Sequence, residues 1–181
     1  MIYLIGVDHK IQHDGKNSYN KNKRKAFSDY IVNKVKDLSI CLLAEEFNED
    51  ALDQSSANES TVRKVAKKIG VDHRFCDPGY EIRRELGIPK REEIISNLDF
   101  EDQINKVGLT RKQEKEVSKE TKKYFSQREK HWFKKIKDKI DLNINIIFIC
   151  GSSHIHIFES LLNDEGIKVK ILVKDFDKIL N

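Results

Sequence analysis

The chain has 181 residues, of which 38% are hydrophobic and 35% are charged, and its formal net charge at pH 7 is +4. This composition is too apolar for an intrinsically disordered protein and too polar for a membrane protein, and no apolar run approaches the roughly 20 residues that span a bilayer. The length suits one core, so we expect residues 1–181 to form a single domain.

The three cysteines, Cys41, Cys76 and Cys150, are widely spaced and odd in number. This pattern argues against a disulfide framework and for a reducing compartment. The first residues, MIYLIGVDHK, lack the basic lead and the long apolar region of a secretion signal. The sequence therefore predicts a cytoplasmic protein in which Cys41 and Cys150 are buried as small apolar side chains.

Short apolar runs alternate with stretches of helical periodicity along most of the chain. This alternation is typical of βαβ units, which build a mostly parallel sheet with flanking helices. In chain order, the pattern predicts a strand over 2–7, a helix over 21–38, a strand over 40–44, a helix over 60–69 that Gly70 ends, a short strand over 71–76, a strand over 145–150, a helix over 153–165 that Gly166 ends, and a strand over 167–173.

The predicted strands differ in how continuously apolar they are. Residues 2–7, 40–44 and 145–150 are almost uninterrupted apolar runs, which suits strands that are covered on both faces. Residues 167–173 alternate lysine with valine and isoleucine, which indicates an edge strand with one solvated face. We therefore predict the α/β class, with a mostly parallel sheet.

Residues 88–140 interrupt this alternation, and we expect them to form a helical insertion or cap. Short helices are the simplest interpretation of residues 88–108, while the apolar spacing of residues 109–140 predicts one long helix. Arg128 falls on the apolar stripe of that helix. Because an unpaired buried charge is costly, Arg128 needs a partner, either a carboxylate or an anionic group of a substrate.

The segment 109–139 is strongly basic, with 12 lysines and arginines against 5 acidic residues. Such a segment attracts phosphate-rich partners, so nucleic-acid binding is one interpretation. A solvated helix face is the simpler one, because no aromatic residues interleave with the lysines as a stacking platform requires.

Ionisable side chains follow four of the predicted strands where each strand ends. His9 follows the first strand within GVDH, Glu45 and Glu46 follow the second within AEEF, Asp77 follows the third, and His154 follows the strongest within GSSH. The carboxyl ends of parallel strands meet at one edge of a sheet, where open α/β sheets bind ligands. We therefore expect these residues to gather in one site.

The tetrapeptides GVDH and GSSH share the spacing GxxH. The glycine is expected to let the chain turn sharply off the strand. His154 then begins a helix, with Ser152 or Ser153 available as its N-cap. Because the positive end of a helix disfavours an imidazolium, we expect His154 to be a neutral base, an electrophile or a metal ligand.

Neighbouring carboxylates at a strand end point in different directions. Of the adjacent pair we favour Glu45 as a general base or metal ligand, because it leaves the strand first, and Glu46 is the other candidate. Asp77 precedes Pro78 and is either a site residue or a turn residue that bonds its own backbone. In the simpler interpretation of the pair, both glutamates face solvent in a loop.

The remaining histidines have no predicted catalytic role. His13 lies in a polar loop, where we expect it to be exposed, and the alternative is a flexible part of the site. His131 is next to the apolar stripe of the long helix, where packing is the expected role, and no role is assigned to His156.

In its order of motifs the chain resembles the TraB/Tiki, ChaN and erythromycin-esterase-like superfamily. The matching pieces are GVDH with His9, AEEF with Glu45 or Glu46, REKHW with Arg128, and GSSH with His154, and GSSHIHIFESLLNDEGIKV resembles the closing stretch of that group. The pieces frame most of the chain but cover only a few dozen residues. The resemblance implies a hydrolase site made of two histidines, a glutamate and an arginine. The chain departs from the pattern in its shorter length and in HRFCDP.

These observations lead to a hydrolase acting on an ester, peptide or phosphoester bond. His9, Glu45 and His154 would hold a divalent metal (Mn, Co, Zn or Fe) or activate water directly, Arg128 would stabilise an oxyanion, and no nucleotide cofactor is expected. One alternative is a non-catalytic module that binds a small anionic ligand. The other is a protein that binds or cleaves nucleic acid through its basic segment. No membrane partner is expected, and the oligomeric state is not predicted.

Overall fold

The computed structural model describes residues 1–101 and 108–179 of the chain. Its centre is one sheet of five strands, in which every strand pair is parallel. The strands are β1 (Ile2–Val7), β2 (Leu42–Glu45), β3 (Asp72–Phe75), β4 (Ile146–Gly151) and β5 (Val169–Val173). The predicted α/β class with a parallel sheet is confirmed.

The strand order β3-β2-β4-β1-β5 places β4 between β1 and β2. In this register Gly6 of β1 pairs with Cys150 of β4, and Glu45 of β2 pairs with Ile149 of β4. The carboxyl ends of four neighbouring strands therefore meet at one edge. The segments that follow these strands begin side by side, although they are far apart in the sequence.

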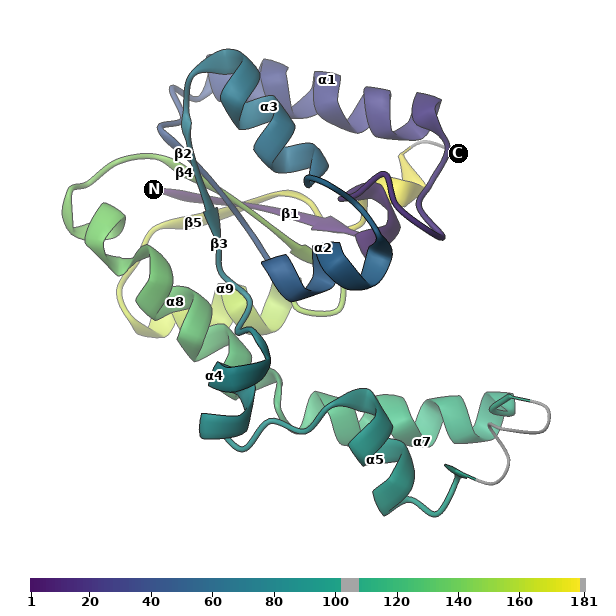
Figure 1. Cartoon of the computed structure of the whole chain (residues 1–181). Helices are drawn as coiled ribbons and strands as arrows, with labels where there is room; N and C mark the ends of the chain where they lie inside the picture. Colours follow the sequence, from purple (N-terminus) through teal and green to yellow (C-terminus); the bar gives the residue numbers. More distant parts are fainter. Residues whose placement is uncertain (102–107, 180–181) are drawn as a thin grey trace.

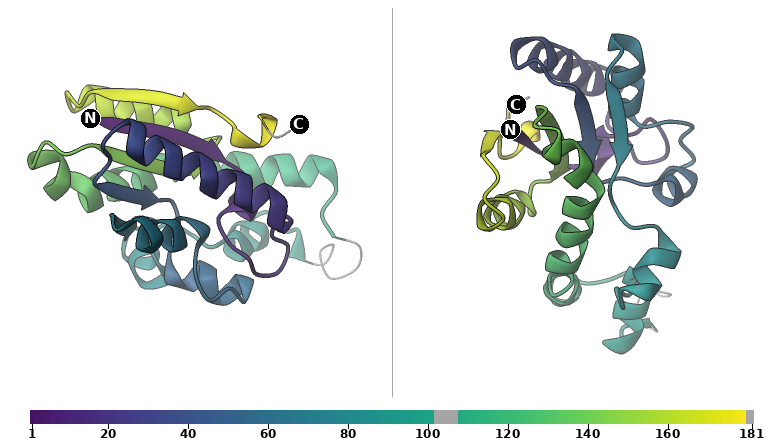
Figure 2. Two further views of the ribbon diagram at one scale, coloured as in Figure 1. Left: turned by 90° about the horizontal axis from the view of Figure 1, so that it is seen from above. Right: turned by 90° about the vertical axis from the view of Figure 1, so that its left-hand side faces the viewer.

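Two helices cover each face of the sheet (Figures 1 and 2). On one face lie α1 (Lys21–Asp37) and α3 (Thr61–Ile69), whose apolar side chains, among them Phe27, pack against β1 and β2. On the other face lie α8 (Phe125–Asp141) and α9 (Ile155–Asp164), where Trp132 is fully buried. Ser60 caps the first turn of α3, and Gly70 ends that helix in the left-handed conformation, as its sequence predicts.

Smaller elements complete the sheet layer. The short helix α2 (Glu49–Ser55) follows β2, and two 3₁₀ turns, His9–Ile11 and Phe176–Lys178, follow β1 and β5. As expected, β5 is an edge strand, and its Lys170 is exposed.

In the described part of the chain between β3 and α8, three helices extend away from the sheet (Figure 1). They are α4 (Tyr80–Glu85), α5 (Arg91–Asn97) and α7 (Arg111–Lys122). A small apolar cluster that includes Ile94, Ile95 and Val117 joins α5 to α7. The expected short helices of residues 88–108 are thus represented by α5, while residues 102–107 lie outside the described part of the chain.

The prediction of one long helix over 109–140 is wrong. The segment is two helices, α7 and α8, with a break at Lys123 and Tyr124. No glycine or proline marks the break. The physical reason is that the two halves bury their apolar sides against different partners, because α7 packs on α5 whereas α8 packs on the sheet.

The prediction that Cys41 is buried is also wrong, because β2 begins one residue later and Cys41 is exposed. Cys76 and Cys150 are buried, and all three thiols are free. Among the residues that the structure describes, none of the helices is both long and apolar enough to cross a lipid bilayer.

Candidate functional site

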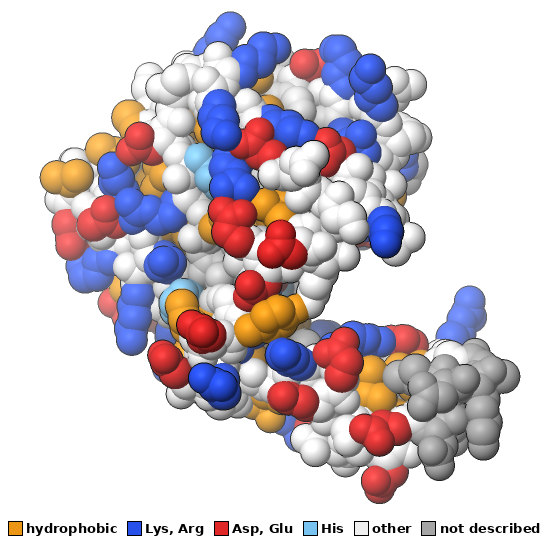
Figure 3. Space-filling view, in the orientation of Figure 1, with side chains coloured by type: hydrophobic (Ala, Val, Ile, Leu, Met, Phe, Trp, Pro, Cys, Tyr) orange, Lys and Arg blue, Asp and Glu red, His pale blue; other side chains and the backbone are white. Residues whose placement is uncertain are grey.

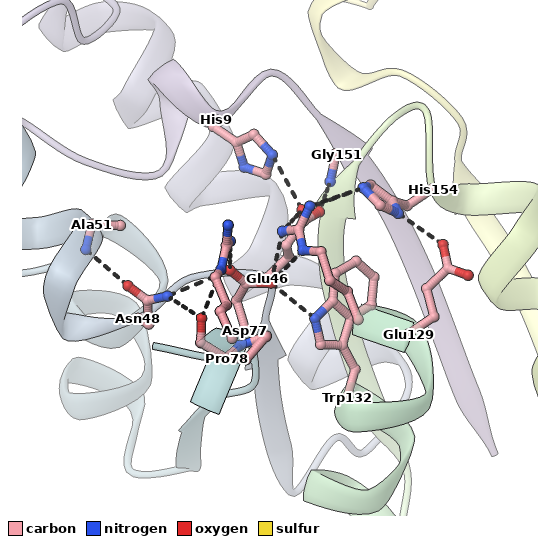
Figure 4. Close-up of polar contacts among 12 residues, drawn as sticks. His9, Glu46, Asn48, Ala51, Asp77, Pro78, Glu129, Trp132, Gly151 and His154 are labelled. Atoms are coloured by element: carbon pink, nitrogen blue, oxygen red, sulfur yellow. Dashed lines mark hydrogen bonds and ion pairs between the residues drawn. The ribbon is translucent and has the colours of Figure 1, made fainter. Parts of the chain in front are cut away.

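Polar side chains from four segments converge at the carboxyl edge of the sheet (Figure 4). His9 follows β1, Glu46 follows β2, Asp77 follows β3, and His154 follows β4. Arg128 reaches the same place from α8. Five of the six residues predicted for the site are therefore brought together, and Glu45 is turned away from them.

Glu46 is at the centre of this group, and its carboxylate is almost fully buried. Its Oε1 atom lies 2.5 Å from Arg128 Nη2, and its Oε2 atom accepts a hydrogen bond of 2.7 Å from the backbone N–H of Gly151. The Nε2 atoms of His9 and His154 lie 3.6 Å and 3.5 Å from Oε1. Figure 4 shows the two imidazoles on opposite sides of the carboxylate.

The predicted partner of Arg128 is a carboxylate or an anionic substrate group, and in the structure two buried carboxylates, Glu46 and Asp77, bind it. Its Nε and Nη2 atoms donate to Asp77 Oδ1 at 2.9 Å and 2.7 Å. Arg83 binds the other oxygen of Asp77 at 2.6 Å, and Trp132 Nε1 donates to Oδ1 at 3.2 Å. Asp77 is thus an ion-pair residue of the site.

Charge pairing decides the ionisation of this cluster. Burial is the largest single influence and would raise the pKa values of Glu46 and Asp77, but the guanidinium of Arg128, together with Arg83 at Asp77 and the two imidazoles at Glu46, holds both pKa values below their usual range. Burial opposes the charged form of Arg128 as well, and the two carboxylates nevertheless raise the pKa of Arg128. All three groups are therefore charged at neutral pH.

His9 is held in one tautomer by a chain of two hydrogen bonds that leads into the core. Its Nδ1 atom lies 2.7 Å from Gln12 Oε1, and Gln12 Nε2 donates to Glu45 Oε2 at 2.8 Å. Because a carboxylate only accepts hydrogen bonds, the Gln12 amide must point its NH₂ group at Glu45 and its oxygen at His9. The proton of neutral His9 is then on Nδ1, and the Nε2 lone pair faces the site.

The preference for Glu45 over Glu46 as the site carboxylate needs correction. Glu45 is fully buried on the opposite face of the sheet, where Ser60 and His73 Nε2 bind its Oε1 atom at 2.5 Å and 2.8 Å. The physical reason is that β2 continues through Glu45, so the alternation of side chains sends Glu45 and Glu46 to opposite faces. Among the described residues, Gln12 is the contact that links Glu45 to the site.

His154 is the most enclosed of the site histidines. Its Nδ1 atom lies 2.7 Å from Oε1 of Glu129, which is fully buried. Neither Ser152 nor Ser153 caps α9 as expected, because His154 itself occupies the N-cap position and makes no side-chain capping bond. The helix instead starts directly after the Gly151 turn, with His154 N–H donating to Gly151 O.

A pocket of about 480 Å³ opens in front of Glu46. Its wall includes His9, His13, Lys16, Arg83 and Arg128. Figure 3 shows the surface deeply indented between the helices around the sheet and the projecting helices. The side chain of His9 is 47% exposed, whereas that of His154 is 3% exposed, so His9 is the imidazole that a ligand can reach.

The prediction that His13 is exposed is wrong. His13 is 8% exposed, stacks on Phe47 with ring centroids 6.0 Å apart, and lines the pocket, and burial lowers its pKa. His131 is half-buried on α8, as its packing role requires, and burial lowers its pKa as well. His156 is exposed, and its Nδ1 atom lies 3.3 Å from Glu159 Oε2.

The glycines of the two GxxH motifs act by close approach to their neighbours. The sequence suggests a sharp turn, but Gly6 and Gly151 are strand residues without a positive φ angle. A Cβ atom on Gly6 would lie 2.0 Å from Lys174 O, and one on Gly151 would lie 3.0 Å from His9 Nε2. Gly151 therefore leaves the room that the His9 ring occupies.

The predicted metal ligands do not converge on one point. His9 and His154 face Glu46, but Glu45 faces Gln12, Ser60 and His73. Both oxygens of Glu46 are already bound, by Arg128 and by Gly151 N–H. Across residues 1–101 and 108–179, no group of three or more His, Cys, Asp or Glu side chains is placed to hold a metal ion. A divalent metal stays a prediction.

Four residues of the site were missed in the sequence. Gln12, Lys16 and Arg83 carry no signal at the sequence level, because the first two lie in a polar loop and Arg83 lies in a charged helical turn. Glu129 could have been found, since it is four residues after Phe125 and three before Trp132, on the apolar stripe of α8. Arg128, which we placed on that stripe, is at its border.

Comparisons with protein-family models, with curated proteins and with solved structures found no match to this chain. The functional interpretation therefore depends on the geometry of the site.

Proposed function

We propose that this protein is a hydrolase that cleaves an ester, peptide or phosphoester bond, with His9 as the general base. The observation that carries the proposal is the hydrogen-bond chain from Glu45 through Gln12 to His9, which leaves the Nε2 lone pair free at an open pocket. A base needs a fixed tautomer and access to substrate, and His9 has both. The resemblance to the TraB/Tiki, ChaN and erythromycin-esterase-like superfamily supports the same class of reaction.

In the proposed reaction, His9 Nε2 takes a proton from a water molecule while the water oxygen attacks the carbonyl carbon or the phosphorus. The imidazolium that forms lies 3.6 Å from the Glu46 carboxylate, which stabilises its charge. The imidazolium then returns the proton to the leaving oxygen or nitrogen as the scissile bond breaks. This is the ordinary exchange of base and acid roles by one histidine.

Arg83 and Arg128 supply the positive charge for the developing oxyanion. Both line the pocket, and both are fixed by Asp77, so they need little reorganisation when the charge develops. This arrangement supports direct activation of water by histidine.

The second candidate function is a module that binds a small anionic ligand without turnover. The observation that favours it is Lys16 at the pocket wall, which has no ion-pair partner among the described residues. A cation without a partner at a pocket attracts a carboxylate or a phosphate group. In the hydrolase, the same lysine would hold an anionic part of the substrate.

The test is a screen of carboxyl esters, phosphoesters and peptides with the wild-type protein and with His9→Ala. We expect the variant to lose about 10²- to 10⁴-fold in kcat/KM while it keeps its fold. His156→Ala is the matched control, because His156 is exposed on α9 and should leave the rate within twofold. Wild-type turnover in His9→Ala would contradict the role of His9.

The binding module gives a different pattern. It predicts no turnover of any substrate class, together with saturable binding of inorganic phosphate that Lys16→Ala weakens and Lys10→Ala does not. Lys10 is a suitable control because it is exposed and lies outside the pocket wall.

A further inference from the structure

Glu129 is a carboxylate on the apolar face of a helix. The buried positions of α8 are Phe125, Glu129, Trp132 and Ile136, and Glu129 is 0% exposed. A carboxylate in such a position opposes folding unless its partners compensate for the lost hydration. The partners of Glu129 therefore indicate why it is there.

Among the described residues, Glu129 has one hydrogen-bond partner, the Nδ1 atom of His154 at 2.7 Å. Its other oxygen, Oε2, is buried without any partner. A buried carboxylate that only supports the fold is expected to have both of its oxygens hydrogen-bonded. Glu129 is thus committed to His154 at a cost in stability.

The ring of His154 has little freedom around this bond. The ring of Phe125 lies at a centroid distance of 3.7 Å, and the ring of Trp132 lies at 4.9 Å. On the far side of the imidazole, Nε2 is 3.5 Å from Glu46 Oε1 and 3.5 Å from Arg128 Nη1. Figure 4 shows Glu129 and Glu46 at opposite ends of the His154 ring.

We propose that Glu129 is a positioning residue that keeps the His154 proton on Nδ1 and directs Nε2 at the Glu46–Arg128 pair. Because Glu129 accepts the Nδ1 proton, Nε2 is left as an acceptor toward the Arg128 guanidinium. The Glu129–His154 pair then matches the chain that fixes His9, and the two imidazoles present the same nitrogen to Glu46. The expected effect of Glu129 on turnover rests on the proposed hydrolase function. The expected tautomer of His154 does not depend on that function.

The first experiment is ¹⁵N NMR of the histidine rings, with His154→Ala to assign the signal. We expect the wild-type protein to carry the His154 proton on Nδ1, and Glu129→Gln to keep it there, because the glutamine oxygen still accepts. In Glu129→Leu the proton should move to Nε2, where Glu46 Oε1 is the remaining acceptor. A wild-type proton on Nε2, or an unchanged spectrum in Glu129→Leu, would overturn the proposal.

The second experiment separates positioning from structural support. Since Oε2 of Glu129 is unpaired, Glu129→Leu should melt at or above the wild-type temperature while its kcat/KM falls about tenfold to a hundredfold. Glu116→Leu on α7 is the control and should change neither quantity. A fall in melting temperature with unchanged kcat/KM would overturn the positioning role. If no substrate is turned over, the hydrolase proposal fails, and the NMR spectra still decide the tautomer.

Discussion

Arg128 is the residue on which the charge balance of the site depends. It is the shared partner of Glu46 and Asp77, and all three side chains are withdrawn from water. When one member of such a buried group is removed, an uncompensated charge remains, which typically costs about 3–5 kcal/mol. Replacing Arg128 therefore tests how the cluster is held together.

We expect Arg128→Met to lower the free energy of unfolding by about 3–5 kcal/mol at pH 7, and by less as the pH falls. In the wild-type protein the pKa values of Glu46 and Asp77 are lowered on folding, so their contribution is complete above the ordinary carboxyl range and is lost as the pH falls through the lowered values. Without Arg128, burial raises the pKa of Glu46. Protonation of Glu46 at mildly acidic pH therefore removes the unpaired buried charge and reduces the loss of stability in the variant.

Urea denaturation of both proteins at pH 7, 5.5 and 4 measures this difference. Arg111→Met is the control, because Arg111 is exposed on α7. A difference between wild type and Arg128→Met that stays constant with pH would contradict the assignment of buried, ionised carboxylates.

The close contact between Gly151 and His9 allows the position of the His9 ring to be tested. A methyl group at this position would lie 3.0 Å from His9 Nε2 and 3.4 Å from Glu46 Oε2. We expect Gly151→Ala to remain folded and to lose at least about tenfold in kcat/KM, because the His9 ring must move away from Glu46. Ser152→Ala, one residue further on, should be neutral. An active Gly151→Ala protein would mean that His9 does not act from its observed position.

At the level of the elements, the sequence was sufficient for the strands and for the edge at which the site lies. The apolar runs end where ionisable residues begin, so His9, Asp77 and His154 could be placed by strand order alone. Glu45 and Glu46 could not, because an error of one residue in the end of β2 exchanges the two faces of the sheet. The break between α7 and α8 was equally hidden, since it follows from contacts with different elements.

The basic surface of α7 provides a test at this level. Lys115, Lys119 and Lys122 lie together around a shallow hollow of the helix. Because α7 projects away from the sheet, we expect their joint replacement by glutamate to leave hydrolysis of a small substrate unchanged (Figure 1). The nucleic-acid alternative predicts instead a binding affinity that falls steeply with salt and is abolished in the triple variant. Fluorescence anisotropy with labelled DNA and RNA at 50 and 200 mM salt measures this binding and shows whether α7 is a nucleic-acid-binding surface or a solvated helix face.

In the whole molecule, the site is assembled from the sheet and from one of the helices that cover it. Its side chains come from the ends of four strands and from α8, so no single segment contains it. The site therefore forms only when these four strands are assembled and α8 is docked on them. Loss of the site should accompany global unfolding.

Whether hydrolysis depends on a bound metal ion can be tested on the whole protein. Because Arg128 already supplies a cation to Glu46, we expect hydrolysis to survive treatment with a chelator, and elemental analysis to give the same trace metal content in wild type, His9→Ala and His154→Ala. Stoichiometric manganese, cobalt, zinc or iron that disappears in both variants would support the metal-assisted form of the reaction instead.

The ion pair between Asp77 and Arg128 has a consequence for how the fold tolerates change. These residues are 51 positions apart in the sequence, yet their side chains touch, and the chain between them leaves the sheet and returns to the same point. An inserted segment whose two ends are held together in this way can be lengthened, shortened or exchanged without altering the strand order. The helices α5 and α7 are therefore a natural place for grafting experiments, because a new segment could replace them while Arg83 on α4, the Asp77–Arg128 ion pair and the other residues of the pocket wall are retained.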